Sequence, residues 1–423
     1  MTPTPEHIEV LVVGGGTAGT IAAIQSAKAG AKTSLIERGS QLGGVTTTGG
    51  VNFPGLFHAW GKQIISGIGW DLVRRTALLE DRELPDFSTI PERHWHHQIR
   101  INGSLYAALA EESCLEAGVD LCFYEFVSSI EAVDGGWKVK SVGPGIERII
   151  HCKVLIDCTG GADVVGMAGF PRLRDPLETQ PGTLMFEFGG YEVSALNGDA
   201  IQRQYENALN TGALKAGDFA TKSGRFISFL QKGGENAQHV FGADGSTSVS
   251  QTKANIEGRR SMLRLLRFRT LPGCENARLL RAQQETAVRE TWRIEGEYSI
   301  TQSDYCTGRQ FADSVCYSFY PIDLHTAEGV KPVPLEEGVV ARIPLRALIP
   351  KYSHGLLVAG RSVASDRMAN SALRVQASAM AMGQAAGACA ALAAQGDVTP
   401  GAVKLSELHH LLRSHQAVVP SPA

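Results

Sequence analysis

The stretch IEVLVVGGGTAGTIAAIQSAKAGAKTSLIE, residues 8–37, predicts a strand, a helix and a second strand in immediate succession. Residues 8–13 are a nearly continuous apolar run, which is typical of a parallel strand buried on both faces. The Ala-rich residues 20–29 predict a helix that ends at Gly30, and residues 33–36 predict the next strand. This order indicates a βαβ unit, from which parallel sheets covered by helices are built.

The glycines of this unit form the pattern Gly14-x-Gly16-x-x-Gly19, directly after a strand and at the start of a helix. In such a loop the first glycine allows the tight turn and the second lets a pyrophosphate approach the backbone. The third allows close helix–strand packing. The helix N-terminus, which includes Thr17 and Ala18, adds N–H donors and a partial positive charge. The loop therefore predicts a dinucleotide site.

Later segments extend the same domain. Residues 127–133, 137–142 and 146–150 alternate apolar and polar residues between tight turns, which predicts a three-stranded antiparallel meander. A helix is predicted at 102–117, strands at 119–123, 154–158 and 355–359, and a long helix of small residues at 374–394. The fold class is therefore α/β, a Rossmann-like domain with a parallel sheet and an antiparallel meander.

Several features favour FAD over NAD as the dinucleotide. Glu37 is not one of them: at the end of the second strand it is placed to accept the ribose hydroxyls of either dinucleotide, and the adjacent Arg38 does not exclude a 2′-phosphate there. The pair Gly43-Gly44 follows, where backbone must pass close to a long cofactor. The meander before residues 154–158 is typical of flavoprotein nucleotide domains, and a small-residue cluster near the C-terminus is placed to approach the flavin ring.

Residues 171–339 differ in composition from the preceding segment and are more aromatic and more polar. Strands are predicted at 183–188 and 225–230, and a basic amphipathic helix at 256–268 whose arginines form a solvated face. We expect an inserted α+β substrate or cap domain at 171–339. The FAD-binding domain is then discontinuous and consists of residues 1–170 and 340–423.

Composition excludes several classes of protein. Of 423 residues, 40 are Lys or Arg and 43 are Asp or Glu, so the net charge of −3 gives no bulk reason to bind nucleic acid or an anionic membrane. The start of the chain does not resemble a secretory signal, and the charge-free residues 375–396 indicate a buried helix rather than a membrane span. Eight cysteines without a CxxC pair indicate reduced thiols and a cytoplasmic location, and we expect no metal site.

A set of motifs extends over nearly the whole chain. They are VVGGGTAG at 12–19, IER at 36–38, LGG at 42–44, IDCTG at 156–160 with Asp163, YPIDLH at 320–325, RIPLR at 342–346, LVAGR at 357–361, LRV at 373–375 and MGQAAG at 382–387. With these motifs the chain resembles the FAD-dependent oxidoreductase family of the glutathione-reductase-like flavoproteins, distantly related to the succinate dehydrogenase and fumarate reductase flavoproteins.

The resemblance implies further contacts with the cofactor. It places Thr159-Gly160 and Asp163 next to FAD, and Gly360-Arg361 with the backbone of Leu373, Arg374 and Val375 beside the isoalloxazine; Val127 is also expected among the cofactor contacts. The chain departs from the family pattern at residues 367–372, where histidines and a Gly-Ser are common and Arg-Met-Ala-Asn-Ser-Ala stands here. No substrate therefore transfers from the resemblance.

Candidate catalytic residues lie just before the chain returns to the FAD-binding domain. Asp323 and His325 are two apart, so on an extended segment the carboxylate orients the imidazole. Tyr320 is a further candidate, and Arg346 is placed to hold a substrate carboxylate in a bidentate fashion. The alternative interpretation is that these residues only join two domains through salt bridges.

Together these features predict an enzyme, an FAD-dependent oxidoreductase that transfers a hydride between flavin N5 and a carbon of a small organic substrate. Only one dinucleotide fingerprint is present, so the electron partner is oxygen, a quinone, another carrier or transient NAD(P)H. A flavin monooxygenase and a non-catalytic flavin-binding protein are the alternatives. His58 is a minor candidate for a covalent flavin link.

Overall fold

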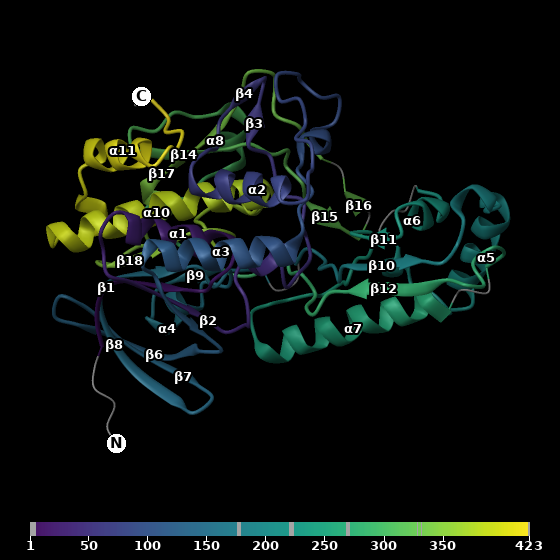
Figure 1. Cartoon of the computed structure of the whole chain (residues 1–423), viewed down its shortest axis with the longest axis horizontal. Helices are drawn as coiled ribbons and strands as arrows, with labels where there is room; N and C mark the ends of the chain where they lie inside the picture. The colour runs from purple at the N-terminus through teal and green to yellow at the C-terminus, as the bar shows by residue number, and fades with distance from the viewer. Residues whose placement is uncertain are drawn as a thin grey trace.

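A computed structural model describes residues 6–175, 179–219, 224–267, 271–327, 329–330 and 332–421. Its main sheet has seven strands in the order β5-β2-β1-β8-β7-β6, with β18 paired to β8 (Figure 1). These strands are β1 (Glu6–Val13), β2 (Thr33–Glu37), β5 (Asp120–Phe123), β6 (Phe126–Val133), β7 (Gly136–Gly143), β8 (Ile146–Asp157) and β18 (Leu356–Val358). β5, β2, β1, β8 and β18 are parallel, and β6, β7 and the start of β8 form an antiparallel meander. The predicted α/β class is confirmed.

β8 corrects one prediction. Residues 146–150 and 154–158 were expected to form two strands, but β8 runs without a break from Ile146 to Asp157. Its first half pairs with β7, its end pairs with β18, and β1 lies along its other edge. The polar residues between the two apolar runs belong to the part of the strand that is half exposed, so they do not interrupt it.

Two helices from opposite ends of the chain cover this sheet together. α1 (Thr17–Lys28) packs on α10 (Gln376–Gly396), and Ser26 Oγ donates to Gly387 O at 3.0 Å. A Cβ on Gly383 would lie 2.2 Å from Ala18 O, so the small residues let the two backbones touch. α10 begins at Gln376 rather than at residue 374, because Arg374 ends the separate helix α9 (Arg367–Leu373).

α10 is the one helix in the described part of the chain that is long and apolar enough to cross a membrane. However, 94% of its apolar window is buried inside the protein. The helix is therefore accounted for by packing in the core.

Residues between about 184 and 282 form a second lobe, on the right in Figure 1, with its own apolar cluster. It contains β10 (Phe186–Gly189), β11 (Gly234–Glu235), β12 (Arg278–Ala282), α5 (Gly198–Asn210), α6 (Ile227–Gln231) and α7 (Ser248–Arg267). The strand predicted at 225–230 is wrong, because this segment forms α6, whose Phe229 packs on Phe186 and Phe226. The basic helix is longer than predicted toward its N-terminus, and its predicted end at Phe268 lies outside the described residues.

The arginines of α7 are only partly a solvated face. Arg259, Arg260 and Arg267 are exposed, but Arg264 is half-buried and holds the carboxylate of Asp218 with two hydrogen bonds of 2.8 and 2.7 Å.

The remaining α-helices and strands lie outside the second lobe as defined above. They are β3 (His58–Ala59), β4 (Lys62–Gln63), α2 (Ile68–Leu78), α3 (Gly103–Ala117), α4 (Asp163–Met167), β9 (Arg172–Leu173), β13 (Arg293–Ile294), α8 (Gln302–Thr307), β14 (Ser314–Ser318), β15 (His325–Thr326), β16 (Gly329–Val330), β17 (Ala341–Pro344) and α11 (Leu405–Ser414). Ile294, Val315 and Leu335 belong to the core of the main sheet rather than to that of the lobe. The division of the chain at 171 and 339 stays a prediction.

Candidate active site

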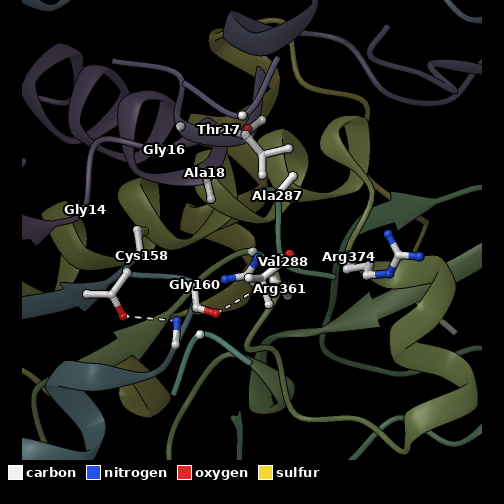
Figure 2. A pocket seen from close by; sticks show the side chains of 18 of the residues that line it. Gly14, Gly16, Thr17, Ala18, Cys158, Gly160, Ala287, Val288, Arg361 and Arg374 are labelled. Atoms are coloured by element: carbon white, nitrogen blue, oxygen red, sulfur yellow. Dashed lines mark hydrogen bonds between the residues drawn. The ribbon is translucent and has the colours of Figure 1, made fainter. Parts of the chain in front are cut away.

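A cavity of about 920 Å³ lies at the carboxyl ends of β1, β2 and β8. This volume is near the upper end of the range for small-molecule and cofactor sites. Figure 2 shows the glycine loop at one side of the cavity and Arg374 at the other. Most of the predicted cofactor residues line it: Gly14, Gly16, Thr17, Ala18, Glu37, Arg38, Gly44, Val127, Thr159, Gly160, Asp163, Gly360, Arg361, Arg374 and Val375.

The glycine loop has the geometry that a pyrophosphate requires. Gly14 has φ +98°, and a Cβ there would lie 2.6 Å from Cys158 O. A Cβ on Gly19 would lie 1.8 Å from Gly14 O, whereas one on Gly16 would meet nothing within 4 Å. No side chain caps α1, so the N–H groups of its first turn remain for an anion. Protein atoms thus fill the space next to Gly14 and Gly19, whereas the space next to Gly16 is free of protein atoms.

Glu37 joins the loop to the end of β2. Its Oε2 accepts from Gly15 N at 2.7 Å and its Oε1 from Gly39 N at 2.6 Å. Each carboxylate oxygen keeps a further acceptor position, which fits ribose hydroxyls. Gly43 packs on the loop through Gly43 N and Gly15 O, at 2.8 Å, and does not line the cavity.

The turn after β8 forms another part of the cavity wall. Buried Asp157 accepts from Thr159 N and Thr159 Oγ1, at 3.0 and 2.7 Å, and from Val165 N at 3.0 Å. Burial raises the pKa of Asp157 to about 6 in spite of these bonds. Burial also raises the pKa of Asp163, whose N–H donates to Thr159 Oγ1. This turn presents Gly160 to the cavity.

Three arginines line the cavity from the turn at Gly160 to the side away from the glycine loop. Arg361 Nε donates to Gly160 O at 2.9 Å, and its guanidinium also bonds Val288 O (Figure 2). Arg289, only 9% exposed, donates to Pro181 O at 2.6 Å and to Asn236 Oδ1 at 3.3 Å. Arg374 donates to Asp323 O at 3.2 Å, and its Nε is buried without a partner.

Positive charge is therefore in excess at this wall. Burial lowers the pKa of Arg289 to about 9 and that of Arg361 to about 10, and it lowers the pKa of Arg374 as well. Among the described residues, neither Arg289 nor Arg361 makes an ion pair, and Arg374 has only Asp323, at 3.8 Å. Because buried charges are stabilised by opposite charges, this wall fits an anionic ligand.

Three of the four predicted catalytic residues also line the cavity: Tyr320, Asp323 and His325. His325 Nε2 lies 3.2 Å from Asp323 Oδ2, which agrees with the predicted orientation of the ring by the carboxylate. Burial opposes ionisation of Asp323, but the hydrogen bond from His325 and the charges of the nearby arginines lower its pKa to about 2. Tyr320 accepts from Gln98 Nε2 at 3.2 Å, and burial raises its pKa, so its hydroxyl stays protonated.

The structure does not bring Arg346 to this cavity. Arg346 is half exposed, and its guanidinium forms two hydrogen bonds with Asp313, at 3.0 and 3.1 Å. The proposed role in substrate binding is therefore corrected, because that guanidinium already has a carboxylate elsewhere on the surface. Gly19 and Leu373 are buried behind the cavity wall and do not line it.

His58 also lies away from the cavity. Its ring stacks on Phe87 with the ring centroids 3.9 Å apart, and its buried Nδ1 has no partner. A covalent link from His58 to a flavin in this cavity does not fit that position. In the described part of the chain, no group of three or more His, Cys, Asp or Glu side chains is arranged to hold a metal ion.

The sequence analysis missed Arg289, Gln98 and His239. Arg289 lies in the segment 286–289, which follows the second lobe in the sequence and lines the cavity. His239 belongs to the second lobe and reaches the site through its contact with His325. No motif marks these segments. The one signal was an arginine directly after the small and apolar residues Thr286, Ala287 and Val288.

Two of the residues that depart from the family pattern, at 367–372, form hydrogen bonds to residues of the cavity wall. Asn370 Nδ2 donates to Arg361 O at 2.9 Å, and Asp323 N donates to Ser371 Oγ at 3.1 Å. These residues hold two segments of the cavity wall in place.

A βαβ glycine loop, a carboxylate at the end of the second strand and an antiparallel meander joined to one parallel sheet are typical of the class of flavin-nucleotide-binding proteins. The profile of the family described as FAD dependent oxidoreductase matches residues 9–412, and the chain belongs to that family. The chain is thus an FAD-dependent enzyme. FAD fits the donors and the open glycine position described above, and it supplies the hydride chemistry when bound.

Solved structures show distant similarity. A geranylgeranyl bacteriochlorophyll reductase-like protein from Thermoplasma acidophilum has 13% identity and a TM-score of 0.45, with 97% of this chain and 84% of that chain covered. The anhydrotetracycline hydroxylase OxyS from Streptomyces rimosus has 21% identity and a TM-score of 0.32, with 43% of this chain covered. This similarity spans only 38% of the length of OxyS. A comparison with curated proteins gave no match.

Proposed function

We propose that this FAD-dependent oxidoreductase transfers a hydride between flavin N5 and a carbon of a small organic substrate that carries a carboxylate. The observation that supports this is the excess of buried positive charge at one end of the cavity. Arg289 and Arg374 line the same cavity as Tyr320 and Asp323. Among the described residues, Asp323 is the one carboxylate that forms an ion pair with either arginine, 3.8 Å from Arg374. A substrate carboxylate balances this charge and fixes the orientation of the reacting carbon.

The chain's own groups have distinct tasks in this proposal. The arginines bind the carboxylate, Tyr320 donates a hydrogen bond from its neutral hydroxyl, and the glycine loop and Glu37 hold FAD. The electron partner is oxygen, a quinone, another carrier or transient NAD(P)H. Comparing product formation with and without oxygen distinguishes a dehydrogenase from a monooxygenase.

The test is anaerobic bleaching of the flavin absorbance by a panel of hydroxy acids, amino acids, simple carboxylic acids, amines and alcohols. We expect carboxylates to bleach the flavin and the matched uncharged alcohols and amines to fail. Arg289→Met should raise the KM for the active acid at least about 10-fold, the loss of one charge-assisted hydrogen bond. Arg346→Met is the matched control, because that arginine is paired with Asp313 outside the cavity. Equal bleaching by acids and by uncharged analogues would contradict the proposal.

We also propose a cytoplasmic location, supported by the eight cysteines, all of which are unpaired. Fractionation of cells that express the tagged chain tests this, and recovery of the protein in a secreted fraction would contradict it.

A further inference from the structure

A second histidine stands behind His325. His239 Nε2 lies 3.0 Å from His325 Nδ1, and His325 Nε2 lies 3.2 Å from Asp323 Oδ2. The two rings are 5.1 Å apart between centroids and meet at 67°. Both nitrogens of His325 are therefore engaged, and three polar groups form one continuous chain of hydrogen bonds.

The partners decide where the protons lie. Asp323 is ionised and accepts only, so the hydrogen of His325 is on Nε2. The Nδ1 of His325 then has no hydrogen and accepts from His239 Nε2–H. Every bond in the chain thus points the same way, from His239 toward Asp323.

The charges around the pair keep both rings neutral at pH 7. Burial and the nearby Arg289 lower the pKa of His325 to about 4, although Asp323 opposes this; Arg374 lowers it further. Burial, Arg289 and His325 lower the pKa of His239 to about 3, again against Asp323. Neither ring holds an extra proton at rest, so a proton that passes along the chain moves through it without staying.

The chain also has a direction in space. Asp323 and His325 line the cavity, and His239 does not. His239 belongs to the second lobe, beside the half-exposed ring of Phe241, and is itself 6% exposed. The three residues therefore lead from the cavity wall to a buried ring that lies next to an exposed side chain.

We propose that His239, His325 and Asp323 form a proton-transfer chain for the active site, with His239 as its outer member; this rests on the proposed function. One proton from water binds Nδ1 of His239 as the Nε2 proton of His239 moves to Nδ1 of His325. The Nε2 proton of His325 moves to Asp323, and Asp323 gives one proton to the substrate atom that needs it. One proton enters and one leaves, and both rings then carry their hydrogen on Nδ1. The reverse sequence, which removes a proton from the substrate, starts from that state and returns the hydrogen of each ring to Nε2. His239 touches neither substrate nor flavin, so it is a positioning residue.

The first test needs no substrate. In FAD-loaded protein labelled with ¹⁵N-histidine, NMR should show His325 protonated on Nε2, with an Nδ1 that accepts a hydrogen bond. His239→Gln keeps a donor near the place of Nε2 and should preserve this state. His239→Ala should shift the Nδ1 resonance of His325. His409→Gln is the matched control, since His409 is another buried histidine, and it is bonded to Ser314 O rather than to a residue of the cavity. An unchanged His325 spectrum in His239→Ala, or a hydrogen on its Nδ1, would overturn the proposal.

The second test uses the acid that bleaches the flavin. His239→Gln should slow turnover at least about 10-fold and increase the solvent isotope effect, because an amide cannot pass on a proton. Added imidazole should partly restore turnover in His239→Ala. Wild-type turnover with an unchanged isotope effect in His239→Gln would overturn the proposal. If no acid bleaches the flavin, the function proposed above fails, while the NMR result still decides whether the chain exists.

Discussion

Replacement of single glycines in the loop should separate cofactor binding from folding. Gly16 has φ −71° and ψ −170°, which alanine adopts without strain, and its added Cβ would meet no protein atom within 4 Å. Gly16→Ala should therefore fold normally. In the FAD complex, however, the methyl group takes the space through which the pyrophosphate reaches the N–H groups of α1.

The magnitude follows from the bonds displaced. Loss of one charge-assisted hydrogen bond costs about 1.5–3 kcal/mol, which corresponds to a Kd for FAD about 10- to 100-fold higher. Gly19→Ala is the comparison, because its Cβ would lie 1.8 Å from Gly14 O and forces the backbone apart. That variant should lose about 3 kcal/mol or more of unfolding free energy.

The assays are titration of apoprotein with FAD, followed by fluorescence, and urea unfolding of each variant without FAD. The reasoning is refuted if Gly16→Ala binds FAD as tightly as the wild type. It is refuted equally if Gly19→Ala is as stable as the wild type.

Three further predictions concern stability. Burial and His97 lower the pKa of His58 in the folded chain to about 4. As the pH falls from 6.5 to about 4, the unfolded chain therefore binds more protons than the folded chain, and the free energy of unfolding decreases. His58→Phe should flatten this dependence in urea unfolding between pH 7 and pH 5. Trp137→Phe removes the bond from Nε1 to Gly355 O, at 2.8 Å, and should cost about 1–2 kcal/mol in the same assay. Asp218 is 1% exposed and paired with Arg264, so Asp218→Asn should cost about 3–5 kcal/mol, seen as faster proteolysis of the second lobe.

Each prediction has an outcome that contradicts it. A pH profile of His58→Phe that parallels the wild type would mean that His58 is not protonated on unfolding in this range. Unchanged unfolding of Trp137→Phe would show that the bond contributes nothing net. Wild-type resistance of Asp218→Asn to protease would show that the neutral amide serves as well as the buried ion pair.

The sequence predicted most of the residues at the glycine-loop end of the cavity and missed Arg289 and His239 at the other end. The βαβ unit is local, and its glycines, helix start and strand-end carboxylate lie within residues 14–37, so spacing alone determines their arrangement. Asp323 and His325 were found because they are two apart on an extended segment. Arg289 and His239 were missed because tertiary packing, and no local motif, brings the segment after the second lobe and a histidine of the lobe to the site.

The wrong secondary-structure predictions have physical causes of the same kind. Residues 225–230 carry aromatic and β-branched side chains that favour a strand, but Phe226 and Phe229 stack on each other within the core of the lobe as α6 turns. The predicted break in β8 came from His151 and Lys153, which are half-buried and exposed where the meander meets the parallel sheet. In both places tertiary surroundings overrode local preference.

The contact between α1 and α10 has a consequence for how the chain is made. Ser26 bonds Gly387, and 361 positions separate them in the sequence. On the ribosome, α1 therefore emerges long before its partner helix, and its Ala-rich face stays uncovered until nearly the whole chain has been synthesised. Because such distant pairings form slowly, we expect the nucleotide-binding half to mature last, after translation, with chaperones protecting α1 in the interval.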